Sequence, residues 1–213
     1  LLGRGLKIVG TNALFAYEAA AGVFVDPEIA TTQDIDLLFD ARRELGFVAR
    51  GAVGGEGLLG LLKRIDPSFE PGRESFRAAN DEGYLVDLVR PEARPPWRKV
   101  RETLSEAEGD LSAVAIEGLE WLENAPPFEA VAMDEKGMPL RIVAVDPRIF
   151  AAHKLWLSQK VDRDPLKRAR DAAQARAVGQ IVRTQLTHLR PSLREMSVLP
   201  RPILDAALPL FER

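Results

Sequence analysis

The chain has 213 residues, of which 46% are hydrophobic and 29% charged, and its formal net charge is −3. These values are typical of a soluble protein with one large domain or two small ones, and no apolar run approaches the roughly 20 residues that a membrane helix needs. There is no cysteine and there are two histidines, which excludes disulfides and disfavours a zinc site. Any bound metal would therefore have oxygen ligands, as Mg²⁺ and Mn²⁺ do, and we expect a cytoplasmic protein. Because the sequence starts at Leu1 rather than at methionine, we expect it to begin within a longer protein or at a trimmed end.

The start of the chain predicts a strand, a glycine turn and a helix. Residues 6–9 are an apolar run that predicts a buried strand, and the alanine-rich residues 13–21 favour a helix. Gly10 lies between them, followed by Thr11 and Asn12, either of which is a candidate N-cap. A strand that turns through glycine into a helix directs backbone N–H groups toward an anion, so this turn is a candidate phosphate site.

A second strand and a glycine-rich segment follow. Residues 35–39 predict a strand, and residues 51–57, which hold four glycines, precede a predicted helix over 58–65. A glycine-rich loop before a helix can bind phosphate, but this pattern matches neither the P-loop nor the dinucleotide-binding motif. We therefore interpret the glycine-rich segment as a flexible lead-in to the helix.

Two β-hairpins are predicted in the middle of the chain. The first joins strands over 75–79 and 84–89 through a four-residue polar turn, and the second joins strands over 128–133 and 140–145. Between the hairpins, three prolines within 91–96 mark a break, and the charged residues 97–110 predict a loop or a surface helix.

Helices alone are predicted after residue 145. Asp146-Pro147 and Asp164-Pro165 each combine a capping side chain with a proline in the first helical turn. Together these elements predict an α+β fold, with a mixed sheet and flanking helices over residues 1–145 and a small helical domain over residues 146–213. The predicted helices of that domain cover 148–159, 166–182 and 202–208.

Three aspartates on predicted strands carry the strongest chemical signal. Residues two apart in a strand share a face, so Asp34 and Asp36 project together while Ile35 points the other way. Two adjacent carboxylates repel each other unless a divalent cation lies between them. Asp87 interrupts an apolar strand, and such a charge is paired, solvated at a sheet edge or bound to a metal. If the two strands are neighbours, the three carboxylates converge and can hold two metal ions; the alternative is polar strand-end residues without a ligand.

The arrangement of Gly10-Thr11, Asp34-Ile35-Asp36 and Asp87 resembles that of the polymerase-β-like nucleotidyltransferases. Residues 146–156 and 163–171 look like the helical part of a poorly characterised bacterial branch with this fold. The gap between Thr11 and Asp34 is longer than in minimal members, and Thr stands where most members have Ser or Gly. The resemblance implies a nucleotidyltransferase-like fold in which the three aspartates bind Mg²⁺ or Mn²⁺ and the Gly10-Thr11 turn holds the triphosphate.

Basic residues of the helical part are further candidates. The resemblance places Lys154 on the triphosphate, with an ordinary surface lysine as the alternative, and Arg163 and Lys167 are the best phosphate-binding candidates of a stretch interleaved with acids. We interpret most of that stretch as a solvated helix, in which Lys167 and Asp171 form an i,i+4 pair. His153 has apolar neighbours one turn away, which favours a core histidine over a catalytic one.

The leading hypothesis is an enzyme that binds a nucleoside triphosphate between the two parts of the chain. It would transfer a nucleoside monophosphate to an acceptor hydroxyl on a tRNA, a protein or a small molecule, and a toxin of a toxin–antitoxin pair is among the possible roles. The second hypothesis is a catalytically silent nucleotide-binding or protein-interaction module with the same fold. A plain nucleic-acid binder is disfavoured by the acidic net charge. The nucleotide, the acceptor and the oligomeric state do not follow from the sequence.

Overall fold

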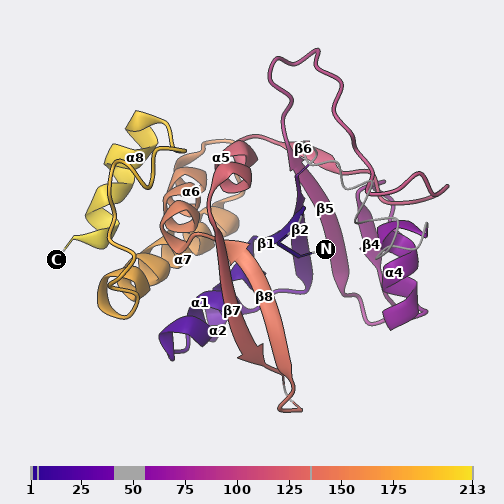
Figure 1. Cartoon of the computed structure of the whole chain (residues 1–213), viewed down its shortest axis with the longest axis horizontal. Coiled ribbons are helices and arrows are strands. Elements are labelled where there is room, and N and C mark those ends of the chain that lie inside the picture. Colours follow the sequence, from indigo (N-terminus) through magenta and orange to yellow (C-terminus); the bar gives the residue numbers. More distant parts are fainter. Residues whose placement is uncertain (1, 4, 41–55, 135, 213) are drawn as a thin grey trace. The chain divides into compact units, whose positions relative to one another are not determined.

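The computed structural model describes residues 2–3, 5–40, 56–134 and 136–212, which form two compact units (Figure 1). The sheet unit comprises residues 1–10 and 32–123, and the helical unit comprises residues 11–31 and 124–213. Residues 51–55 of the glycine-rich segment and Glu135 of the second predicted turn lie outside the described residues.

The described strands of the sheet unit form a mixed sheet. They lie in the order β3-β4-β5-β2-β1, and β6 pairs with β5. The pairings of β2 with β5 and of β5 with β6 are parallel, whereas those of β1 with β2, β3 with β4 and β4 with β5 are antiparallel. The elements are β1 (Leu6–Val9), β2 (Asp34–Phe39), α4 (Gly57–Ile65), β3 (Glu70–Pro71), β4 (Arg77–Ala79), β5 (Leu85–Pro91), β6 (Val114–Ile116) and α5 (Leu119–Asn124).

The central strands of this sheet are buried where they are apolar. In β2, Leu37, Leu38 and Phe39 are all buried, whereas Asp34 and Asp36 at its start are half-buried. Successive side chains of a strand point to opposite faces, so a continuous buried run shows that both faces of the second half of β2 are covered. The polar start of β2 is therefore the part of this strand where ligands can approach.

Two polar contacts tie the helices of the sheet unit to distant segments. Asp110 accepts hydrogen bonds from the backbone N–H groups of Leu58 (2.7 Å) and Leu59 (3.2 Å) in the first turn of α4. Lys7 of β1 donates to the carbonyls of Leu122 (3.2 Å) and Glu123 (3.0 Å) at the end of α5. A carboxylate at a helix start and an ammonium at a helix end both complement the helix dipole. The first N–H groups of α4 are therefore already bonded to Asp110. This favours the interpretation of the glycine-rich segment as a lead-in to the helix over that of a phosphate site.

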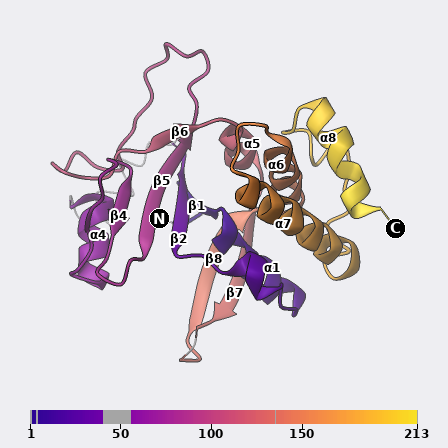
Figure 2. The ribbon, with the colours of Figure 1, turned by 180° about the vertical axis from the view of Figure 1, so that it is seen from behind.

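In the helical unit, a hairpin and several helices pack together. Strands β7 and β8 pair antiparallel along their whole length, from Pro127 opposite Val145 to Met133 opposite Pro139. Figures 1 and 2 both show α6 beside α7. The elements are η1 (Thr11–Ala13), α1 (Leu14–Ala21), α2 (Pro27–Ala30), β7 (Pro127–Met133), β8 (Pro139–Val145), α6 (Pro147–Gln159), α7 (Pro165–Thr184), α8 (Arg201–Ala207) and η2 (Leu208–Phe211).

Tyr17 of α1 joins three other elements in the core of the helical unit. Its ring meets Phe128 of β7 and Phe150 of α6 edge-on, with centroid distances of 5.5 Å and 5.3 Å. Its buried hydroxyl donates to the carbonyl of Val145 in β8 at 2.9 Å. Edge-to-face rings each add about 1 kcal/mol to the burial of their area, and the hydrogen bond satisfies the one polar atom of the side chain.

Most of the predicted elements are confirmed. Both hairpins form, the α+β class with a mixed sheet and flanking helices is confirmed, and the described residues 97–110 contain no helix. Asp146 accepts from the N–H of Arg148, and Asp164 accepts from the N–H groups of Leu166 and Lys167, so both predicted caps are present. The prediction that Thr11 or Asn12 caps the first helix is wrong. These residues form the short 3₁₀ helix η1, and the N-cap of α1 is Ala13.

The sequence did not predict the short elements α2, β3, β6 and α5, each of which spans six residues or fewer. The hairpin β7–β8 and residues 11–31 belong to the same compact unit as the C-terminal helices. The domain limits 1–145 and 146–213 stay a prediction. Among the described residues, no helix is both long and apolar enough to span a membrane.

Gly179 provides a test of the packing between α7 and η2. A Cβ atom at Gly179 would lie 2.9 Å from the carbonyl oxygen of Leu210 and 3.0 Å from its Cβ. Alanine normally stabilises a helix by about 1 kcal/mol relative to glycine, but here the close contact would force the two segments apart at a cost of about 1–3 kcal/mol. We expect Gly179→Ala to lower the urea midpoint, with Gln180→Ala at the neighbouring exposed position as the control. A higher midpoint for Gly179→Ala would contradict this packing.

Candidate active site

The parallel pairing of β2 with β5 brings the three predicted aspartates onto neighbouring strands. Asp36 lies opposite Asp87 in the register, and Asp34 lies two residues earlier on the same face of β2. The two strands are thus neighbours, which is the condition for the three aspartates to lie close together. Figures 1 and 2 show β2 and β5 side by side.

Asp87 lies inside the sheet, where it forms an ion pair. Strand β5 has β4 on one side and β2 on the other, so the alternative of an edge strand that solvates Asp87 is wrong. Asp87 is 6% exposed, and Arg77 of β4 donates to both of its oxygens, from Nε to Oδ1 at 2.7 Å and from Nη2 to Oδ2 at 2.6 Å. The hydrogen bond to Asp87 is the main reason why the pKa of Arg77 is raised.

Arg77 was not predicted from the sequence, because the predicted four-residue turn pairs Ala79 with Tyr84 and so sets Phe76, not Arg77, opposite Asp87. In the structure the turn closes with the N–H of Asn80 donating to the carbonyl of Tyr84. Counting outward from this pair in an antiparallel ladder places Arg77 directly opposite Asp87, as the register shows. A hairpin with a known turn length therefore predicts its cross-strand ion pairs.

Gly10 and Asp36 are in close contact. Gly10 has a φ of +64°, and a Cβ atom at this position would lie 2.0 Å from Oδ2 of Asp36. Both the left-handed backbone and the contact disfavour a larger residue, which would have to displace the carboxylate of Asp36. The carboxylate of Asp36 is therefore held against the backbone of the turn that the sequence predicts to bind phosphate.

Asp34 is also surrounded by polar groups. It accepts a short hydrogen bond from the hydroxyl of Thr32. Its charge raises the pKa of Arg77 and, after the larger effect of burial, that of Tyr84. Asp34 thus lies within electrostatic range of Arg77. Asp34, Asp36 and Asp87 lie on one face of the sheet, here called the carboxylate face, and Arg77 lies on it with them.

The fit of a divalent cation to these residues is partial. Asp34 and Asp36 are half-buried carboxylates on one face, which are the ligands that Mg²⁺ prefers. Both oxygens of Asp87 are engaged by Arg77. Within residues 2–3, 5–40, 56–134 and 136–212, no group of three or more His, Cys, Asp or Glu side chains converges closely enough to hold a metal ion. Asp34 and Asp36 are therefore the residues of this face that could hold a cation, whereas both oxygens of Asp87 are bonded to Arg77.

Thr11 lies in the helical unit, where its hydroxyl is buried. It accepts a hydrogen bond from Nε2 of Gln174 at 3.2 Å, and the same nitrogen donates to the carbonyl of Ile29 at 2.6 Å. Gln174 of α7 is fully buried. The hydroxyl that the sequence predicts to contact phosphate thus helps to join η1 to α7.

Lys154 and Arg163 share a buried carboxylate. Nζ of Lys154 lies 2.8 Å from Oδ1 of Asp171, and Nε of Arg163 donates to Oδ2. Burial raises the pKa of Asp171, but the two cations outweigh this effect and hold its pKa below the usual value. The surface-lysine alternative for Lys154 is wrong because the side chain is 7% exposed. The predicted i,i+4 pair of Lys167 with Asp171 is wrong as well, since both carboxylate oxygens are already bonded and Lys167 is exposed.

Residues 1–198 match a sequence model of a nucleotidyltransferase family. The chain belongs to this family. The curated proteins and the solved structures provide no match to it. Membership of the family supports a nucleotidyltransferase function, for which the aspartates of β2 and β5 are the candidate catalytic groups.

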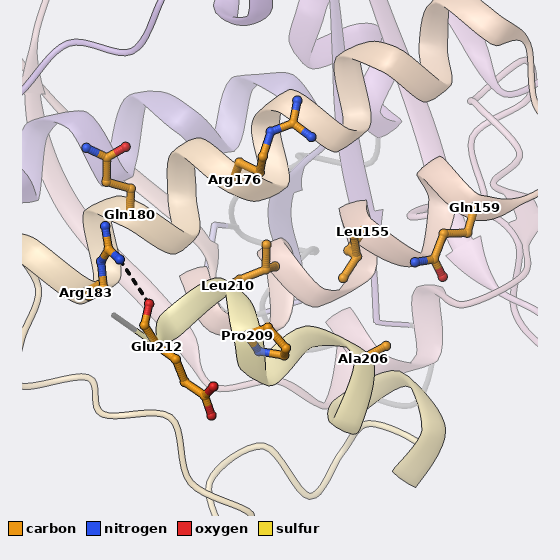
Figure 3. Close-up of a pocket in the computed structure, with 9 residues that line it drawn as sticks. All are labelled: Leu155, Gln159, Arg176, Gln180, Arg183, Ala206, Pro209, Leu210 and Glu212. Atoms are coloured by element: carbon orange, nitrogen blue, oxygen red, sulfur yellow. Dashed lines mark hydrogen bonds between the residues drawn. The ribbon is translucent and has the colours of Figure 1, made fainter.

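A groove of about 470 Å³ lies on the helical unit of this member of the family (Figure 3). Arg176, Gln180 and Arg183 of α7 line it, and Arg183 donates to the backbone carbonyl of Glu212 at 3.0 Å. None of the residues that line the groove belongs to the predicted site. The remaining lining residues are Leu155, Gln159, Ala206, Pro209 and Leu210.

The contact between Gly10 and Asp36 can be tested with a matched pair of variants. Gly22 has a similar φ of +66°, but a Cβ atom there would meet nothing within 4 Å. Alanine at either position costs about 1 kcal/mol of backbone strain, and Gly10→Ala also displaces Asp36 at a further cost of about 1–3 kcal/mol. We expect urea unfolding to show a larger loss for Gly10→Ala than for Gly22→Ala. Equal losses would contradict the contact.

The lowered pKa of His153 makes the stability of the fold depend on pH. Burial, followed by the charge of Lys154, lowers its pKa from 6.5 to about 3. Between these values the unfolded chain binds a proton that the folded chain does not, so stability falls as the pH is lowered, by about 2 kcal/mol at pH 5. We expect His153→Phe to remove this part of the loss between pH 7 and pH 5 in urea unfolding. A substitution of the exposed His188 is the control, and an unchanged pH dependence in His153→Phe would contradict the assignment.

Proposed function

We propose that the chain transfers a nucleoside monophosphate from a nucleoside triphosphate to an acceptor hydroxyl, with release of pyrophosphate. The observation that carries this proposal is the register of β2 and β5, which aligns Asp36 with Asp87 and leaves Asp34 on the same face. The family match supports the class of reaction. The finer assignment to the polymerase-β-like superfamily and its bacterial branch rests on the motif resemblance and is part of the proposal.

In this proposal the aspartates and the Gly10-Thr11 turn have separate roles in binding and catalysis. Asp34 and Asp36 would bind Mg²⁺ or Mn²⁺, which polarises phosphoryl oxygens and offsets the negative charge that develops during transfer. Gly10, which has no side chain, would let the backbone approach the β- and γ-phosphates, with Thr11 beside it in the chain. Asp87 would accept the proton of the acceptor hydroxyl, because each of its oxygens keeps a further lone pair when Arg77 is bound.

The phosphate contacts proposed for Lys154, Arg163 and Lys167 rest on the resemblance. Lys167 is exposed, whereas Lys154 and Arg163 are held by Asp171. We therefore rank Lys167 first among these residues and propose that Lys154 acts by fixing Asp171 and, through it, Arg163.

Asp36→Asn is the direct test of the site. The substitution keeps the shape of the side chain and removes the charge that a cation needs, so we expect Mg²⁺-dependent transfer to fall at least about 100-fold while the circular dichroism spectrum is unchanged. Asp81→Asn in the exposed hairpin turn is the control, with activity like that of the unaltered chain. Full activity of a folded Asp36→Asn protein would overturn the proposal.

The acceptor requires a screen. Labelled ATP, CTP, GTP and UTP would be incubated with the chain and either total RNA, total protein or a set of small molecules with hydroxyl groups. Label on RNA, on protein or on a small molecule identifies the acceptor class, and a role as a toxin is supported only if the modification stops growth.

The second candidate function, a silent nucleotide-binding module, is favoured by one observation. Asp87 is engaged by Arg77, so the carboxylates do not form a three-ligand group. Calorimetry with the four triphosphates, with and without Mg²⁺, separates the two functions. Metal-dependent binding without transfer to any acceptor pool would support the module.

A further inference from the structure

Arg77, Asp87 and Asp36 form one row across three neighbouring strands. Arg77 of β4 lies opposite Asp87 of β5, and Asp87 lies opposite Asp36 of β2. Directly opposed residues of adjacent strands project to the same side of a sheet. The guanidinium of Arg77 and the three carboxylates therefore belong to one face, where Arg77 also senses the charge of Asp34.

The side chain of Arg77 is fixed from several directions. Its guanidinium carbon lies 5.4 Å from the centroid of the Phe76 ring, and Glu74 lies 3.9 Å from Nη1. A Cβ atom at Gly72 would lie 3.1 Å from Cγ of Arg77, so the backbone of Gly72 packs closely along the side chain. Together with the two hydrogen bonds to Asp87, these contacts hold the guanidinium in one position.

A bidentate guanidinium and a divalent cation are alternative partners for a carboxylate. Both neutralise its charge, and a cation beside Asp87 would stand next to the positive charge of Arg77, which repels it. The side chain of Asp87 is 8% exposed, so solvent screens this repulsion weakly.

We propose that Arg77 is a positioning residue that takes the place of a second divalent cation at Asp87, so that the chain binds a single cation, at Asp34 and Asp36. This inference rests on the proposed function and differs from the two-metal arrangement that the three aspartates suggest in the sequence. Arg77 holds Asp87 in one orientation through its two hydrogen bonds, and the cation site is built from β2 alone.

The number of Mn²⁺ ions bound per chain tests the proposal without an activity measurement. The full chain would be titrated with MnCl₂ alone, with electron paramagnetic resonance detecting unbound Mn²⁺. We expect one Mn²⁺ per unaltered chain and two per Arg77→Gln chain, because loss of the guanidinium makes Asp87 available as a ligand.

Three further variants serve as controls. Arg73→Gln removes the same charge from an exposed residue nearby and should leave one ion. The double variant Arg77→Gln/Asp87→Asn should bind one ion, because it lacks the released carboxylate. If Arg77→Gln alone does not fold, Mn²⁺ should restore its folded circular dichroism spectrum, since the cation replaces the lost guanidinium. Arg77→Lys keeps the charge and should bind one ion.

The outcomes separate this inference from the proposed function. Two Mn²⁺ ions in the unaltered chain, or one in a folded Arg77→Gln chain, would overturn the role of Arg77 while leaving nucleotide transfer intact. A destabilised Arg77→Gln chain that Mn²⁺ does not restore would also overturn it. Failure of the unaltered chain to bind any Mn²⁺, together with failure of transfer, would overturn the proposed function itself.

Discussion

The parallel pairing of β2 with β5 is the constraint on which the carboxylate face depends. It sets Asp36 opposite Asp87, and because a shift by one residue would turn the side chains of a strand to the other face, the register decides whether the aspartates meet. On the same strand, the apolar residues Leu37, Leu38 and Phe39 are buried in the core. The packing of the core and the position of the catalytic candidates are thus one property of the same strand.

In both units a buried aspartate is paired with basic side chains. In the sheet unit Asp87 is held by Arg77, and in the helical unit Asp171 is held by Lys154 and Arg163. Removing one partner of such a pair leaves a charge without compensation in a region of low polarity, at a cost of about 3–5 kcal/mol. Asp87, which is a ligand candidate in the sequence, and Asp171 are therefore also structural groups, and their chemistry is understood only when the basic side chains beside them are included.

The functional evidence has two independent parts. The family match covers residues 1–198 and supports the class of reaction, whereas the geometry of Asp34, Asp36 and Gly10 supports the location of the site. Neither part identifies the acceptor. Recognition of an acceptor depends on the shape and polarity of a surface, and the residues that line the described groove of the helical unit do not select one class of molecule.

Periodicity and turn chemistry in the sequence determined the main elements of this protein. Asp-Pro pairs predicted the starts of α6 and α7, and turn residues predicted both hairpins, because these signals act between residues close in the chain. The sequence also placed Asp34 and Asp36 on one strand face. Tertiary structure alone decided that β5 lies beside β2, that Asp110 caps α4, and that Lys154 is buried on Asp171. These contacts join residues far apart in the chain, so they depend on how the elements pack, which no local pattern encodes.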